Sequence, residues 1–172
     1  MAIQSKTSIF KKVLNFGPLI LLYISVMNEF DFNYLNYKYF SFNFPFILIF
    51  YWSLKRIDSL GYGYIFIAGL FNDVVIGFPI GLSSLTYLII CGFAAYLKNI
   101  TLRPSLFKDW LYFLFTILVA NSINYFLLLS FFSVEINYYE LSSNIFFTFL
   151  LYYIFGYLFD IYQRVAFGRK DD

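Results

Sequence analysis

The sequence contains no histidine, and one of its 172 residues, Cys91, is a cysteine. The absence of histidine excludes His-based acid–base catalysis and proton relays, and it excludes zinc sites of the usual Cys/His spacing. A lone cysteine cannot form an intrachain disulfide, and its apolar surroundings predict a small buried side chain. The chain also lacks a Gly-x-Ser-x-Gly elbow, a phosphate-binding loop and a cluster of metal ligands. We therefore expect neither an enzyme nor a bound cofactor.

Charged residues are also scarce. They make up 13% of the chain, and hydrophobic residues make up 61%, whereas an ordinary soluble domain is about 25% charged. A soluble fold of this length could not bury so much apolar surface. The composition predicts an all-α integral membrane protein, with residues 1–172 forming one domain in the lipid bilayer. The net charge of +2 and the lack of a basic stripe argue against nucleic acid as a partner.

Apolar runs bounded by charged or turn residues predict six transmembrane spans. The second run is short, since twelve helical residues rise about 18 Å and a hydrocarbon core is about 30 Å thick. Three explanations for this short run remain open. The span extends back through Tyr39, the bilayer is thinner there, or the run does not cross the membrane completely. The predicted spans are Val13–Asn28, Asn43–Leu54, Leu60–Gly77, Gly81–Leu97, Trp110–Phe132 and Ser143–Gln163.

The basic residues predict the orientation of these spans. With the amino terminus inside, every one of the 12 Lys and Arg residues except Lys38 falls on the cytoplasmic side. This distribution follows the positive-inside rule. Removing one predicted span would invert the orientation of every later span and loop and would destroy the pattern. The sequence therefore predicts a multi-pass protein of the bacterial inner membrane, with both termini in the cytoplasm.

The third and fourth spans contain the main candidate site. From Leu60 to Leu97 the sole charged residue is Asp73, and a charge at mid-bilayer costs about 2.5–3.5 kcal/mol on insertion scales. Proline and glycine near it predict a tight reversal and an antiparallel hairpin. The motif either binds a partner or substrate around Asp73, or its glycines allow close packing while a neighbour satisfies Asp73. The candidate residues are Gly69, Asn72, Asp73, Gly77, Pro79 and Gly81.

Two polar features elsewhere carry further predictions. Asn121 and Asn124 lie on one face of the fifth span, at the depth of Asp73 when helical rise is counted from the inner ends. We expect one of them to donate a hydrogen bond to Asp73, and both also suit ordinary contacts between helices. Asp160 and Arg164 are one turn apart near the inner end of the sixth span and predict an ion pair.

Residues 44–90 resemble a known family. The matching features are Phe44-Pro45 through Tyr51-Trp52, Gly69-Leu-Phe-Asn-Asp73, and Gly77, Pro79 and Gly81-Leu82. In this order and spacing they resemble the bacterial rod shape-determining protein MreD. The chain departs from the family pattern at Ile57, where a proline is frequent, and at Ser84, where alanine is common.

The resemblance implies a non-enzymatic scaffold of the cell-wall elongation complex. Such a protein binds the single-span protein MreC and links MreB filaments to a RodA-like glycosyltransferase and a penicillin-binding transpeptidase. The family is also similar in structure to the substrate-binding subunits of energy-coupling-factor vitamin transporters. This implies a six-helix bundle and supplies an alternative function. Those subunits carry an alanine-rich first span, whereas Val13–Asn28 contains no alanine.

Overall fold

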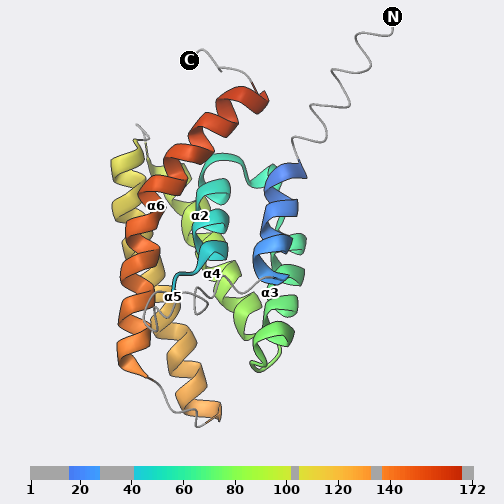
Figure 1. Ribbon diagram of the computed structural model, residues 1–172, viewed down its shortest axis with the longest axis vertical. Helices are drawn as coiled ribbons and strands as arrows, with labels where there is room; N and C mark the ends of the chain where they lie inside the picture. The colour runs from blue at the N-terminus through green and yellow to red at the C-terminus, as the bar shows by residue number, and fades with distance from the viewer. Residues whose placement is uncertain (1–15, 28–40, 102–104, 133–136, 168–172) are drawn as a thin grey trace, which may run out of the picture.

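A computed structural model describes residues 16–27, 41–101, 105–132 and 137–167. Within these four ranges the chain is helical and contains no strand, which confirms the all-α prediction (Figure 1). Each predicted span overlaps one α-helix, and a short 3-10 turn, Ile57–Ser59, follows the second. The helices are Phe16–Met27, α2 Phe44–Arg56, α3 Tyr62–Ile76, α4 Leu82–Ile100, α5 Leu106–Phe132 and α6 Tyr138–Phe167.

Two of these helices, α5 and α6, are long and apolar enough to cross a membrane, as judged from length and composition within the described ranges. The first helix and α3 are apolar but shorter. Large apolar side chains point away from the bundle on several helices, among them Val74, Phe126 and Phe131. So much exposed apolar surface marks a face that contacts lipid or another protein rather than water.

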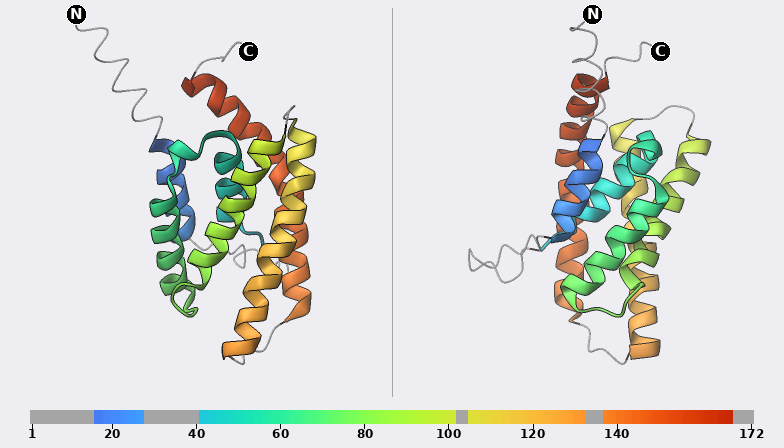
Figure 2. Two further views of the ribbon diagram at one scale, coloured as in Figure 1. Left: turned by 180° about the vertical axis from the view of Figure 1, so that it is seen from behind. Right: turned by 90° about the vertical axis from the view of Figure 1, so that its right-hand side faces the viewer.

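Helix α2 is the buried centre of the bundle. Every residue from Phe44 to Leu54 is buried, and residues 47–50 are completely inaccessible. Pro45 fits the first turn because the amide that it lacks has no partner inside a helix. Lys55 and Arg56 lie in the last turn, where cations interact favourably with the helix dipole. In both figures α2 lies between its neighbours, among them α4 and α6 (Figures 1 and 2).

The length of α2 answers a question that the sequence left open. The helix has 13 residues and begins at Phe44, so it rises about 20 Å. Ser41, Phe42 and Asn43 are not helical, which argues against the first of the three alternatives, a helix continuing back through Tyr39. Tyr39 itself lies outside the described residues. Because longer helices surround α2, its length does not have to match the thickness of a bilayer.

The remaining helices pack in chain order around α2. Helix α3 packs on α4, α4 on α5 and α5 on α6. The first helix lies beside α3, where the Tyr23 hydroxyl donates to the Tyr64 carbonyl at 3.3 Å (Figure 1). The α3–α4 turn, residues 77–81, defines what we call the outer end of the bundle. The last turn of α2 and the end of α6 lie at the opposite, inner end (Figure 1).

Candidate functional site

Two glycines make the α3–α4 reversal possible. Gly77 ends α3 with a φ of 77°, and Gly81 precedes α4 with a φ of 101°. Both values lie in the left-handed region, which a residue with a Cβ rarely adopts. The amides of Gly77 and Phe78 both donate to the Asp73 carbonyl at 2.9 Å and close the last turn of α3. The predicted hairpin, with its reversal between Gly77 and Gly81, is confirmed.

The Asp73 carboxylate caps the beginning of α4. Its Oδ2 accepts a hydrogen bond from the Gly81 amide at 2.7 Å, and its Oδ1 accepts one from the Ser83 amide at 2.8 Å. The side chain is completely buried. The first amides of a helix have no partners within it, and their aligned dipoles favour a negative charge. A carboxylate from α3 thus supplies the cap that Gly81 cannot provide from its own side chain.

The predicted hydrogen bond between Asp73 and Asn121 or Asn124 is wrong. Both carboxylate oxygens bind backbone amides of the α3–α4 hairpin. Helix α4 packs against both α3 and α5, and Asn121 faces a groove between α5 and α6. The Oδ1 atom of Asn124 is buried without a partner among the described residues. Asp73 and Asn121 were placed at the same depth along the bundle, but that match did not predict the directions in which their side chains point around their helices.

Small and polar residues hold α3 and α4 close together. The Asn72 Nδ2 donates to Ser83 Oγ at 2.9 Å, and Ser84 Oγ donates to the Phe66 carbonyl at 2.9 Å. A Cβ added at Gly69 would lie 2.6 Å from the Ser84 amide nitrogen. The prediction that Gly69 allows close helix packing is confirmed. The sequence had marked Ser84 only as a departure from a pattern, and its contacts give it a role in this packing.

We expect Gly69→Ala to destabilise the protein by about 1–3 kcal/mol, because the new methyl group overpacks the contact with the Ser84 backbone. Gly63→Ala is the matched control in the same helix, since a Cβ there meets nothing within 4 Å. Because Gly63 is the second residue of α3, that control should change stability by no more than about 0.5 kcal/mol. Unfolding in mixed detergent micelles measures both, and equal effects of the two changes would contradict the close contact.

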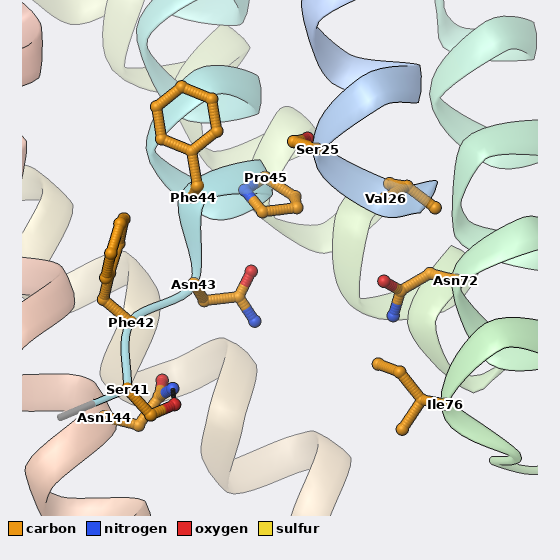
Figure 3. A pocket seen from close by; sticks show the side chains of 10 residues that line it. All are labelled: Ser25, Val26, Ser41, Phe42, Asn43, Phe44, Pro45, Asn72, Ile76 and Asn144. Atoms are coloured by element: carbon orange, nitrogen blue, oxygen red, sulfur yellow. Dashed lines mark hydrogen bonds between the residues drawn. The ribbon is translucent and has the colours of Figure 1, made fainter. Parts of the chain in front are cut away.

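A cavity of about 260 Å³ lies beside this hairpin at the outer end. Its walls come from the first helix, the chain entering α2, the end of α3 and the beginning of α6. Asn43 and Asn72 extend their amide groups toward each other across it (Figure 3). The volume is slightly below the range of about 300–1,000 Å³ that is typical of small-molecule sites. The lining residues are Ser25, Val26, Ser41, Phe42, Asn43, Phe44, Pro45, Asn72, Ile76 and Asn144.

The non-helical residues before α2 are held against α6 at this cavity. Asn144 Nδ2 donates to Ser41 Oγ at 2.7 Å, and the Asn43 amide nitrogen donates to Thr148 Oγ1 at 2.8 Å. In a membrane, non-helical backbone is tolerated where it is buried in protein or lines a cavity. Among the described residues, the cavity lining carries hydroxyl and amide groups and no charged side chain, a composition that suits water or a neutral polar ligand.

A second polar region lies at the inner end. Lys55 Nζ of α2 lies 2.8 Å from Asp109 Oδ2 in the first turn of α5, and the Asp109 side chain is 4% exposed. The Tyr51 hydroxyl donates to Asp160 Oδ1 on α6, and Gln163 Oε1 lies 3.3 Å from the same hydroxyl. Sequence reasoning missed both contacts, because each joins residues that are more than fifty positions apart.

The predicted ion pair between Asp160 and Arg164 is wrong. The Asp160 carboxylate accepts a hydrogen bond from Tyr51 instead, and Arg164 is exposed. An exposed ion pair one helical turn apart is worth only about 0.3–0.5 kcal/mol, so the hydroxyl of a buried helix competes easily for the carboxylate.

We compared the chain with protein-family models, curated proteins and solved structures. None of them matches it. A functional interpretation therefore depends on the residues of this chain, and above all on the α3–α4 hairpin with its capping carboxylate. Among the described residues, no group of three or more His, Cys, Asp or Glu side chains is placed to hold a metal ion.

Proposed function

We propose that the chain is a multi-pass protein of the bacterial inner membrane whose helices form a six-span bundle with both termini in the cytoplasm. The distribution of Lys and Arg supports this orientation, because the loops assigned to the cytoplasm hold all of these residues except Lys38. The large apolar side chains on the outside of α3, α5 and α6 support a lipid environment.

Within that membrane we propose a scaffold of the MreD type for cell-wall elongation. It would bind an MreC-like single-span protein and link MreB filaments to the RodA-like glycosyltransferase and its penicillin-binding transpeptidase. The observation that supports this proposal is that the Asp73 carboxylate caps the beginning of α4. Both of its oxygens accept hydrogen bonds from backbone amides of the α3–α4 hairpin, so the carboxylate organises the hairpin and is occupied within the chain, which suits a structural role better than catalysis or transport.

The outer hairpin also offers a surface for a partner. Phe78 and Ile80 project from the turn between α3 and α4, and Ile80 is 78% exposed. Exposed apolar side chains on a rigid turn suit contact with another protein at the membrane surface. This placement fits a single-span partner that leaves the membrane beside the hairpin.

A second candidate function is a substrate-binding subunit of an energy-coupling-factor vitamin transporter. The polar cavity at the outer end favours it, because amide side chains from two helices and from the segment entering α2 line the cavity (Figure 3). A transport subunit would bind a small neutral molecule in this cavity and would associate with ATPase subunits.

Depletion of the protein in a rod-shaped host distinguishes the two candidates. The scaffold function predicts that rods become spheres on any growth medium, because elongation of the lateral wall fails. A tagged copy should recover MreC-like and synthase proteins. Normal cell shape combined with a vitamin requirement and recovery of ATPase subunits would reject the scaffold in favour of transport. A gene position directly after genes for MreB-like and MreC-like proteins gives an independent check.

A further inference from the structure

Two amide side chains of the outer cavity have hydrogen-bonding capacity that the described chain does not use. The side chain of Asn43 forms no hydrogen bond with the described residues, since only its backbone amide is engaged, with Thr148. Asn72 donates from Nδ2 to Ser83, and its Oδ1 accepts no hydrogen bond within the same ranges. Both side chains are half-buried, so a molecule in the cavity can reach them.

Other polar groups of the lining already have partners. Ser25 donates to a backbone carbonyl one turn earlier in its own helix at 2.7 Å, and Asn144 donates to Ser41 at 2.7 Å. The unused capacity is therefore concentrated at Asn43 and Asn72, whose amides extend toward each other across the cavity (Figure 3). A ligand that lies between them contacts both.

The chemistry of these two amides defines the group that they recognise. A carboxamide presents a donor and an acceptor side by side, so its complement presents an acceptor and a donor in the same way. Primary amides, lactams and cyclic ureides have this arrangement. A ketone and a carboxylate lack the donor, and each would leave the acceptor oxygen of the asparagine unpaired.

The rest of the lining restricts the charge and the size of the ligand. Val26, Pro45 and Ile76 supply apolar surface, and no lining residue in the described ranges is charged. An ion in such a site would lose its hydration without gaining a counter-charge, which is costly. The volume of about 260 Å³ is below the range of about 300–1,000 Å³ for typical ligand sites. The cavity therefore fits a neutral molecule of one or two rings better than a nucleotide.

We propose that the outer cavity binds a small neutral molecule through an amide-type group, a primary amide, lactam or cyclic ureide, held between Asn43 and Asn72. This inference rests on the second candidate function for its biological purpose, because it names the class of substrate that such a subunit takes. Binding to the purified protein is measured independently of cell shape and nutrient uptake. If depletion turns rods into spheres while the amides bind, transport is rejected and the site stands. If no amide binds, the site is rejected and the scaffold function stands.

Equilibrium dialysis of the full-length protein in lipid nanodiscs tests the site, with empty nanodiscs as the background. The probes are benzamide and uracil, each with a matched anion: benzoate replaces the amide by a carboxylate, and orotate adds a carboxylate to the uracil ring. We expect each neutral probe to bind at least about tenfold more tightly than its anion at neutral pH. Asn43→Leu should weaken binding of both neutral probes about tenfold, because it leaves polar atoms of the ligand unpaired. The Asn43 side chain has no described partner to lose, so we expect this variant to fold.

Two control variants separate recognition of the ligand from packing of the helices. Asn99→Leu removes an exposed amide at the inner end of α4 and should leave binding unchanged. Ser83→Ala removes the hydroxyl that is bonded to Asn72 but retains the Asn72 amide, so it should weaken binding less than Asn72→Leu. Retention of the neutral probes no greater than in empty nanodiscs would mean that the cavity holds water only, and it would overturn the proposal. So would equal binding of the anions, or binding that Asn43→Leu leaves unchanged.

Discussion

Lys55→Met is expected to lower the free energy of unfolding by about 3–5 kcal/mol, which is the usual cost of removing one partner of a buried ion pair. The Lys55 ammonium lies 2.8 Å from the Asp109 carboxylate, and that carboxylate is 4% exposed. Without Lys55 the buried Asp109 carboxylate loses the cation that lies beside it. Unfolding in mixed detergent micelles, followed by circular dichroism, measures the loss.

The double variant Lys55→Met, Asp109→Asn should recover most of that loss, because it removes the buried charge together with its partner. Lys98→Met at the end of α4 is the control, since Lys98 is exposed, and it should change stability by no more than about 0.5 kcal/mol. If Lys55→Met behaves like Lys98→Met, the ion pair does not join α2 to α5.

Asp73→Ala should destabilise the protein by about 2–4 kcal/mol, because it leaves two amides at the start of α4 without their acceptor and removes a charge that the helix dipole favours. The affected amides are those of Gly81 and Ser83. Hydrogen exchange at these two amides should therefore accelerate more than exchange in the middle of α4. Both readouts use the purified full-length protein in detergent.

Asp73→Asn should have an intermediate effect, because an asparagine retains one acceptor oxygen and places a donor opposite the second amide. Glu140→Ala is the matched control. Its carboxylate accepts a hydrogen bond from Asn137 on an exposed surface, and its loss should cost little. Unchanged exchange at Ser83 in Asp73→Ala would show that the carboxylate is not the cap of α4.

The local chemistry of the outer hairpin was predictable from the sequence. Gly77, Pro79 and Gly81 allow few backbone paths, and the apolar runs on either side are long enough for two helices. The structure places the reversal between Gly77 and Gly81, with positive φ at both glycines. Predictions of this kind succeed because the constraint acts within a few residues.

The partners of the polar groups were not predictable in the same way. Counting helical rise gives the height of Asp73 and Asn121 but not the direction in which each side chain points around its helix. The first turn of α4 lies eight to ten residues beyond Asp73 and brings its free amides to the carboxylate. Lys55 and Asp109 show the same limitation, because only the packing of α2 against its neighbours brings them together.

The sequence by itself determined that the chain is helical, where its apolar helices lie and where the α3–α4 reversal occurs, because these depend on composition, periodicity and the backbone limits of glycine and proline. Tertiary structure alone decided that α2 is the buried centre, that Asp73 caps α4, and that Asn121 faces a groove on the outside of α5. The physical reason is that hydrogen bonds and burial depend on how helices are rotated and packed against one another, and spacing along one chain does not encode that rotation.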